Sequence, residues 1–258
     1  MTGRGTALVT GASAGIGAAL AREFASHGHD VVPVARREDR LESLASDLER
    51  DHGVAVTPIA MDLDRNEAAR DLYETVRDRG LDVEVLVNNV GVGTYGPFRE
   101  SDLDAERTQL HLNVVLPVEL TRLFLEDFDD GGKVLNVGSV AGFQPGPRMA
   151  GYYASKAYVN SFTEAIAEEL RETPVDVTLV CPGPVDTEFQ ARAGMDDSSV
   201  GSRTSNTPEA VATAAYEGLL DGETVVVPTR AMRAVDLLGR LSPRPLVRRV
   251  AHWVNSDR

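Results

Sequence analysis

The feature that most constrains the fold is a glycine-rich stretch near the N-terminus, Thr10–Gly17, with the sequence TGASAGIG. The apolar run 6–9 before it has strand composition, and 18–24 after it has helical composition and apolar spacing. Glycines between a strand and a helix let an anion approach the backbone, where N–H groups and the positive end of the helix dipole face it. The stretch therefore predicts a phosphate site; the alternative is an ordinary glycine-rich turn.

Strand and helix signals alternate along the chain to about residue 228. Strands are expected at 6–9, 30–35, 54–60, 83–87, 133–138, 175–181 and 223–227. Helices are expected at 18–24, 36–51, 65–79, from 101 or 103, at 152–171 and from 207, where Thr207 is an N-cap and Pro208 the first helical residue. The alternation predicts an α/β fold with a doubly wound, parallel, seven-stranded Rossmann-type sheet and helices on both faces.

Composition excludes several classes of function. The 258 residues carry a net charge of −14, which argues against nucleic acid binding, because phosphate neutralisation needs a basic face. Of 26 basic residues only Lys133 and Lys156 are lysines, which fits a salt-loving source or, alternatively, a GC-rich genome. The five histidines show no metal-ligand spacing, so no metal is expected, and Cys181 in its apolar run is expected in the core. No leader or long apolar segment is evident, which predicts a cytoplasmic protein.

The end of the second expected strand bears on the cofactor. In a dinucleotide-binding fold this point lies beside the adenosine ribose, where an acidic residue binds the 2′-hydroxyl of NAD and an arginine accommodates the 2′-phosphate of NADP. Here Ala35 stands at the acidic position and Arg36 and Arg37 follow it. The sequence therefore favours NADP(H) over NAD(H), and the alternative is a pair of solvated arginines that open a helix.

Tyr152 and Lys156 lie four residues apart near the start of an expected helix and so share a face. A neighbouring ammonium stabilises a phenolate and makes a tyrosine a usable proton donor or acceptor. Tyr153 is the competing candidate, but its partner four residues on is Ala157. Ser139 follows the fifth expected strand, where its hydroxyl could donate to a substrate carbonyl oxygen; the alternative for Ser139 is an ordinary turn serine.

These motifs together resemble a short-chain dehydrogenase/reductase of the simple single-domain type. The glycine stretch, the Asn88-Asn89-Val90-Gly91 run, Ser139, the Tyr152/Lys156 pair and Pro182-Gly183 follow the family's order and spacing over about 5–228. The resemblance implies a catalytic tetrad of Asn113, Ser139, Tyr152 and Lys156. It implies cofactor contacts from Gly11, Ser13, Gly15, Ile16, Gly17, Arg36, Arg37, Asp62, Leu63, Asn89, Gly91, Tyr152, Lys156, Pro182, Gly183 and Thr187, among which the Ser13 hydroxyl could reach a 2′-phosphate.

The resemblance also implies a role for each member of the tetrad. Tyr152 would exchange the proton with substrate, Ser139 would orient the substrate oxygen, and Lys156 would lower the pKa of the tyrosine and hold the nicotinamide ribose. Asn113 would support a water chain that leads to Lys156. The expected function is an NADP(H)-dependent oxidoreductase that interconverts a carbonyl and a secondary alcohol. The alternative is a non-catalytic dinucleotide-binding sensor or scaffold; sugar-nucleotide epimerase or dehydratase chemistry is less favoured, since little chain is left for a second domain.

One residue departs from the family pattern. Val90 stands where the family usually has alanine, and its two extra methyl groups are expected to shift the turn slightly. By family habit the helices at about 101–127 and 152–173 make the contacts of a homodimer or homotetramer.

The substrate side of the chain is less clearly encoded. An apolar pocket is expected from Tyr95, Phe98, Phe143, Pro145, Pro147, Met149, Tyr153, Phe189 and Met195, the alternative for each being loop packing. Arg148 is a candidate for binding an anionic substrate group, and 191–206 is a candidate lid. The tail 229–258 is basic and amphipathic, and Pro243 and Pro245 are expected to divide it into two short helices. Packing on the domain 1–228 or on a partner is favoured over a lid or a contact with a membrane surface.

Overall fold

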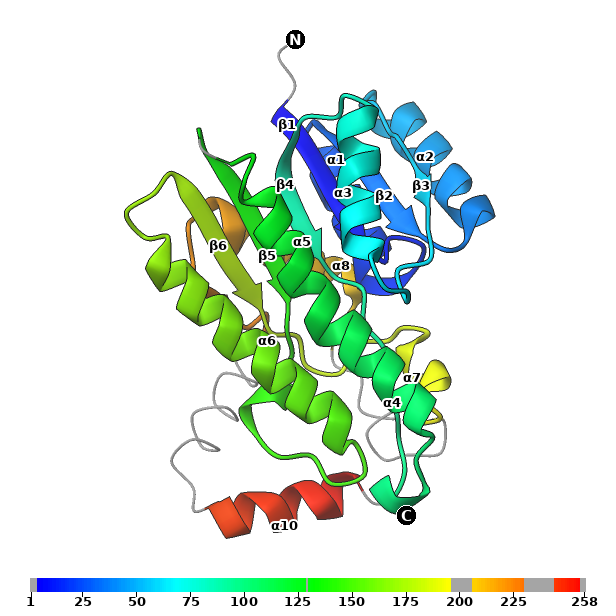
Figure 1. The fold of residues 1–258 in the computed structure, drawn as a ribbon, viewed down its shortest axis with the longest axis vertical. Helices are drawn as coiled ribbons and strands as arrows, with labels where there is room; N and C mark the ends of the chain where they lie inside the picture. The colour runs from blue at the N-terminus through cyan, green and yellow to red at the C-terminus, as the bar shows by residue number, and fades with distance from the viewer. Residues whose placement is uncertain (1–3, 129, 196–205, 230–243, 256–258) are drawn as a thin grey trace.

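The computed structural model describes residues 4–128, 130–195, 206–229 and 244–255. Within these ranges seven strands form one sheet in the order β3-β2-β1-β4-β5-β6-β7, and every neighbouring pair is parallel (Figure 1). The strands are β1 (Arg4–Thr10), β2 (His29–Ala35), β3 (Ile59–Ala60), β4 (Val83–Asn88), β5 (Gly132–Val137), β6 (Val175–Val180) and β7 (Val225–Val226). The doubly wound, seven-stranded sheet predicted from the alternation of motifs is thereby confirmed.

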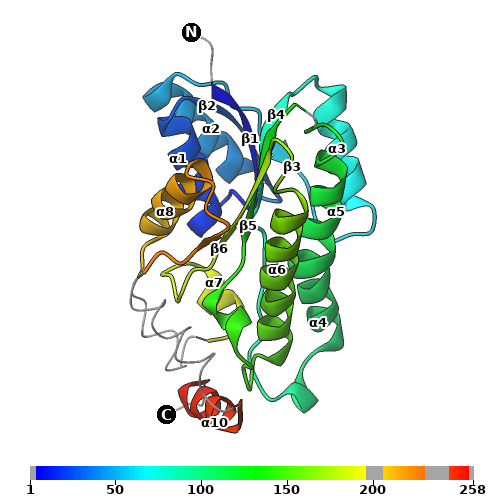
Figure 2. The ribbon, with the colours of Figure 1, turned by 90° about the vertical axis from the view of Figure 1, so that its left-hand side faces the viewer.

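Helices cover both faces of the sheet (Figure 2). One face carries α1 (Gly15–Ser26), α2 (Glu38–His52) and α8 (Pro208–Leu220); the other carries α3 (Ala68–Asp78), α4 (Leu103–Leu110), α5 (Leu116–Phe124) and α6 (Ala150–Glu169). Each layer buries its own apolar cluster against the sheet, with Phe24 and Tyr216 in the first and Leu120 and Phe124 in the second. Strands buried on both faces need the near-continuous apolar runs that the sequence shows.

The third strand is shorter than predicted. A strand was expected over 54–60, but only Ile59–Ala60 pair regularly with β2, preceded by an isolated bridge between Val56 and Val31. Pro58 lies between these two points, and a proline has no N–H to give to a strand ladder. The seventh strand is likewise reduced from the expected 223–227 to Val225–Val226 at the edge of the sheet.

The helix that carries Asn113 is not continuous. One helix was expected from 101 or 103 onward, but a π-helical turn, His111–Val115, separates α4 from α5. Pro117 lacks the N–H that would bond the carbonyl of residue 113 in an α-helix, and loss of that bond widens the turn. The wider turn contains Asn113, which is 1% exposed.

The last described helix lies beyond the carboxyl ends of the strands. There α10 (Arg244–Asn255) lies apart from the two helical layers, below α6 in Figure 2. Pro245 is the second residue of this helix and does not divide it, whereas Pro243 lies outside the described residues. A proline at this position costs no helical hydrogen bond, because the first N–H groups of a helix have no partner within it. Among the described residues no helix is long and apolar enough to cross a membrane.

Candidate active site

A cavity of about 710 Å³ opens at the carboxyl ends of the central strands. Residues that directly follow β1, β4, β5 and β6 line it, which is where parallel α/β sheets bind ligands. Its lining contains sixteen of the predicted site residues: Gly11, Ser13, Gly15, Ile16, Arg36, Arg37, Asp62, Leu63, Asn89, Gly91, Ser139, Tyr152, Lys156, Pro182, Gly183 and Thr187. The fold thus brings together residues spread over most of the chain, while Gly17 and Asn113 lie just behind the wall.

The glycine stretch forms a cradle that a side chain would fill. Gly11 and Gly15 have positive φ angles of 72° and 54°, which glycine adopts without strain. A Cβ on Gly15 would lie 3.0 Å from Cγ2 of Thr187, and one on Gly17 would lie 2.3 Å from the carbonyl oxygen of Gly11. The open backbone at the start of α1 therefore suits the close approach of a pyrophosphate.

The turn after β4 is tied to this cradle by Thr10. The Thr10 hydroxyl accepts hydrogen bonds from the N–H groups of Asn89, at 3.0 Å, and Val90, at 3.2 Å. The Asn89 amide donates to the Thr10 carbonyl at 2.8 Å. The Val90 side chain packs against the buried cluster beneath α3 and α5, so this turn accommodates the larger residue while keeping its anchor to β1.

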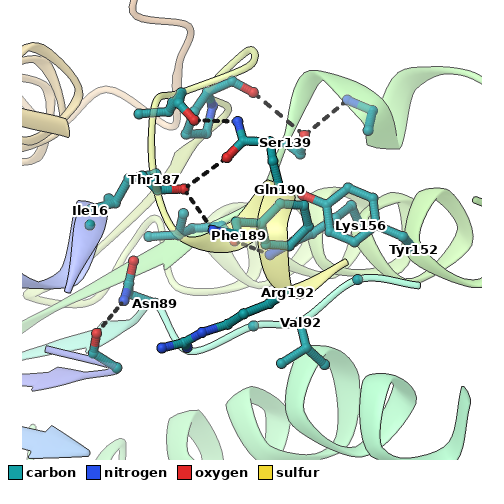
Figure 3. Close-up of a pocket in the computed structure, with 18 of the residues that line it drawn as sticks. Ile16, Asn89, Val92, Ser139, Tyr152, Lys156, Thr187, Phe189, Gln190 and Arg192 are labelled. Carbon is teal, nitrogen blue, oxygen red and sulfur yellow. Dashed lines mark hydrogen bonds between the residues drawn. The ribbon is translucent and has the colours of Figure 1, made fainter. Parts of the chain in front are cut away.

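Ser139, Tyr152 and Lys156 meet inside the cavity (Figure 3). Tyr152 lies in the first turn of α6 with its phenol near the hydroxyl of Ser139, which stands two residues after β5. The Ser139 hydroxyl itself donates to the Pro182 carbonyl at 3.5 Å and accepts from the N–H of Ala141 at 3.1 Å. Lys156 lies one turn further along α6, and its Nζ donates to the carbonyl of Val137 at 2.7 Å. The four-residue spacing thus places both side chains on one face, as predicted.

Burial dominates the electrostatics of this group. It raises the pKa of Tyr152 to about 12, against a smaller lowering by the neighbouring Ser139 hydroxyl, and it lowers the pKa of Lys156 to about 8. The expected lowering of the Tyr152 pKa by Lys156 is therefore not what this geometry produces: the ammonium is directed at the Val137 carbonyl. Tyr152 is therefore protonated at neutral pH and holds the proton that a donor needs, while the raised pKa makes it a weaker acid than a free tyrosine.

The buried lysine predicts a pH-dependent stability. Because the pKa of Lys156 falls to about 8 on folding from about 10.4 in an unfolded chain, the unfolded state binds more protons between these values. The contribution of Lys156 to the free energy of unfolding therefore rises from pH 8 to pH 10.5. Any stability advantage of a Lys156→Met variant over wild type should shrink across this range, as measured by urea unfolding at pH 7 and pH 10. Lys133→Met, which removes the other lysine, controls for the lost charge; an unchanged difference for Lys156→Met would contradict the lowered pKa.

Asn113 supports the site from behind. Its Oδ1 accepts from the N–H of Val92 at 2.9 Å, and its Nδ2 donates to the Val92 carbonyl and to the Ser155 hydroxyl, both at 2.9 Å. The amide therefore links the turn after β4 to α6. Gly91 lies close to both Asn113 and Lys156: a Cβ added to Gly91 would be 3.2 Å from Oδ1 of Asn113 and 3.6 Å from Nζ of Lys156.

Comparison with known proteins assigns the family. A family model described as short chain dehydrogenase matches residues 5–198. An uncharacterized oxidoreductase of Staphylococcus saprophyticus is 31% identical over 238 residues, which cover 89% of this chain and 97% of that protein. The chain belongs to the short-chain dehydrogenase family. As a member it is an NAD(P)-dependent dehydrogenase or reductase.

Other relatives of this short-chain dehydrogenase differ in length and bound cofactor. Mouse 17-beta-hydroxysteroid dehydrogenase type 3 is 33% identical over 187 residues, covering 70% of this chain and 60% of that enzyme; the chain likewise covers 61% of a short chain dehydrogenase of Pseudocercospora fijiensis. A short-chain dehydrogenase of Sphingobium yanoikuyae solved with NADPH has a TM-score of 0.82 at 32% identity, covering 92% of this chain and 93% of that one. One of Burkholderia phymatum was solved with NAD, with a TM-score of 0.81 at 25% identity, covering 91% and 92%.

At the adenosine end of this short-chain dehydrogenase, Arg37 is held by Ser13. Its Nε and Nη2 donate to the Ser13 hydroxyl at 3.2 and 3.0 Å. Arg36 is exposed at the rim, Asp62 accepts from the N–H of Asp64 at 3.2 Å, and Leu63 is buried in the wall. Two cationic side chains therefore lie at the place predicted for a 2′-phosphate.

The substrate side was predicted in part. Met149, Tyr153, Phe189 and Met195 line the cavity, and the rings of Phe189 and Tyr152 lie 5.2 Å apart (Figure 3). The other expected residues stand outside the lining: Phe98 is 64% exposed in the 3-10 turn Phe98–Glu100, Phe143 packs under β6, and Tyr95, Pro145 and Pro147 are not part of the wall. The Arg148 guanidinium stacks on the Tyr95 ring at 4.9 Å and is not in the lining. The candidate lid 191–206 falls largely outside the described residues.

The apolar pocket expected from the sequence left out two parts of the wall, although 191–206 and the tail were each considered as a lid. The C-terminal helix contributes Val250, Ala251, Val254 and Asn255, and the Asn255 amide donates to the Pro147 carbonyl at 3.0 Å. The Asn255 carbonyl accepts from the hydroxyl of Tyr95 at 2.6 Å. The short helix α7 (Phe189–Arg192) contributes Gln190 and Arg192, and Glu188 precedes it. In the sequence, the signal for this part of the wall is the spacing of Ala251 and Asn255, which lie four residues apart and so share one face of a helix.

Proposed function

We propose that this chain is an NADP(H)-dependent oxidoreductase that interconverts a carbonyl and a secondary alcohol, with Tyr152 as the proton donor and acceptor. The observation that carries the proposal is the meeting of the Tyr152 phenol and the Ser139 hydroxyl in a cavity whose other end is the glycine cradle. A proton donor and an anion cradle in one cavity are the parts that such a redox reaction needs.

The residues present fit a phosphorylated dinucleotide. The cradle at Gly11, Gly15 and Gly17 leaves room for a pyrophosphate, and Ser13, Arg36 and Arg37 offer a hydroxyl and two guanidinium groups for a 2′-phosphate. Lys156 and Thr187 would hold the nicotinamide end. When bound, the dinucleotide supplies or accepts the hydride.

The chain's own residues then handle the oxygen and the proton. The Ser139 hydroxyl would donate to the substrate oxygen and stabilise the negative charge that develops on it. Tyr152, which is protonated at neutral pH, would give its proton to that oxygen when a carbonyl is reduced. Lys156 lies one turn further along α6, and its Nζ, which donates to the Val137 carbonyl, would face the nicotinamide ribose.

The substrate is proposed to be a bulky, largely apolar carbonyl or alcohol. Methionine, phenylalanine and valine side chains from three separate segments, among them Met149, Phe189, Met195 and Val254, line the part of the cavity beyond Tyr152. Relatives support this choice: one is a mouse hydroxysteroid dehydrogenase, and a solved structure of 29% identity and TM-score 0.77 is a bulky-bulky ketone specific alcohol dehydrogenase of Comamonas testosteroni.

The direct test is oxidation of NADPH and NADH, followed at 340 nm, over a panel of bulky ketones, aldehydes and quinones at low and high salt. We expect turnover of at least one ketone, with kcat/KM for NADPH exceeding that for NADH by about tenfold or more, the effect of about one charge-assisted contact. Dinucleotide binding without turnover across the panel would instead favour a sensor. Equal use of NADH would overturn the cofactor preference alone.

We also propose that the chain forms a homodimer or homotetramer through α4, α5 and α6. Leu103, Leu110, Val115 and Tyr158 are large apolar side chains on this side of the molecule, and each is more than two-fifths exposed. Large apolar side chains left exposed on neighbouring helices are typical of a subunit interface. Light scattering on the purified protein measures the state directly, and a monomer at micromolar concentration would contradict it.

A further inference from the structure

A single carboxylate bridges the two ends of the cofactor groove. The Glu188 side chain accepts from Arg37 at 3.0 Å and from Arg40 at 2.6 Å, both at the start of α2. It also accepts from Arg192 on α7 at 2.5 Å. These three cations lower the pKa of Glu188 to about 2, so it is charged at any physiological pH. Residues 151 positions apart are thereby joined across the cavity mouth.

This bridge occupies the donors that a 2′-phosphate would need. Nε and Nη2 of Arg37 donate to the Ser13 hydroxyl, Nη2 also donates to the Ser13 carbonyl at 3.4 Å, and Nη1 donates to Glu188. Of the five N–H groups of the guanidinium, this leaves a single one, on Nη1. A guanidinium presents its N–H groups in one fixed plane, so a phosphate cannot gain a bidentate contact there unless an existing partner leaves. The Ser13 contact comes from a neutral hydroxyl, whereas Glu188 carries the negative charge that a phosphate would meet.

We propose that Glu188 is a specificity-determining residue that competes with the 2′-phosphate of NADP(H) for Arg37; this inference rests on the proposed preference for NADP(H). A phosphate can displace the carboxylate because it carries close to two negative charges and three acceptor oxygens. Glu188 then keeps Arg40 and Arg192 and is not left without a counter-charge. NAD(H) has no such phosphate and leaves the bridge in place.

The bridge also connects the adenosine end to the chemistry. Glu188 lies between Thr187, whose Cγ2 faces the glycine cradle, and Phe189, whose ring lies against Tyr152. The phosphate therefore loosens one of the contacts that hold this segment at the moment when the cofactor enters beside it. The side chains of Glu188 and Arg37 are 40% and 29% exposed, so solvent screens the attraction between them. Replacing the carboxylate by a phosphate therefore costs little free energy.

Calorimetric titration with 2′,5′-ADP and with 5′-AMP tests the inference without turnover, because the two ligands differ by the 2′-phosphate alone. We expect Glu188→Gln to lower the Kd for 2′,5′-ADP by about three- to tenfold, the scale of one partly exposed ion pair. The Kd for 5′-AMP should stay within about twofold. Glu38→Gln, which removes an exposed carboxylate from the first turn of α2, is the matched control for the change in net charge and should give a smaller shift.

The outcomes separate the two proposals. If wild type binds 2′,5′-ADP more tightly than 5′-AMP but Glu188→Gln and Glu38→Gln shift the affinity equally, the preference stands and the role of Glu188 is overturned. Weaker 2′,5′-ADP binding in Glu188→Gln also overturns it, because the carboxylate would then be orienting Arg37 for the phosphate. If wild type binds the two ligands equally, both proposals fail. Circular dichroism on each variant shows that the fold is retained, and Glu188→Ala repeats the test with no polar group at this position.

Discussion

Replacing Tyr152 with phenylalanine is expected to lower kcat for ketone reduction by about 10²- to 10⁴-fold, the usual contribution of a positioned acid or base. The phenol hydroxyl is the group that reaches the Ser139 hydroxyl in the cavity, and phenylalanine keeps the ring that packs near Phe189. Binding of NADPH should stay within about threefold, since the pyrophosphate cradle lies elsewhere. Steady-state kinetics together with a binding titration separate the two effects.

Tyr153→Phe is the matched control for this experiment. Its hydroxyl lies 3.5 Å from Oδ1 of Asn255 and belongs to the wall formed with α10, while the residue occupies the next position of the same helix. We expect a change of less than about tenfold in kcat/KM, the scale of one neutral hydrogen bond. Unchanged turnover in Tyr152→Phe, or equal losses in the two variants, would contradict the role of Tyr152.

A Gly17→Ala substitution is expected to weaken dinucleotide binding by about 100-fold, the effect of a misplacement of about 1 Å in a binding geometry. The new Cβ would lie 2.3 Å from the carbonyl oxygen of Gly11 and 2.8 Å from its carbonyl carbon. These are backbone atoms, so the cradle itself must shift. The N–H of Gly11 bonds the carbonyl of Val34 at 2.8 Å, and that anchor to β2 should be strained as well. Calorimetric titration with NADPH measures the loss.

Gly28→Ala is the comparison that isolates this steric effect. Gly28 follows the same helix, has a φ angle of 84°, and has open space where a Cβ would be added. We expect it to lower the unfolding free energy by about 1 kcal/mol through backbone strain, with NADPH binding unchanged. Should Gly17→Ala bind NADPH as wild type does, the cradle would not be the pyrophosphate site.

Much of the fold was determined by local sequence. Apolar runs alternating with helical periods fixed a parallel sheet with helices on both faces, because strands buried on both sides and helices buried on one have different repeats. The glycine stretch, Ser139 and the Tyr152/Lys156 spacing could be found for the same reason: each depends on residues within one turn of helix or at one strand end. The errors in the strand at 54–60 and in the helix around Asn113 came from Pro58 and Pro117, whose missing N–H groups alter hydrogen bonding locally.

Contacts between distant segments were decided only by the tertiary structure. Nothing near Glu188 in the sequence indicates that it meets Arg37, and nothing near Asn255 indicates that it meets Pro147 and Tyr95. The pKa of Tyr152 is a further case. The four-residue spacing predicted a neighbouring ammonium that would lower this pKa, but burial of the phenol raises it and the Lys156 side chain is directed at the Val137 carbonyl. Sequence spacing fixes which side chains share a face. The tertiary structure determines the direction in which that face points and how far it is exposed to water. Those two properties set the protonation states and the binding affinity of the groups in this site.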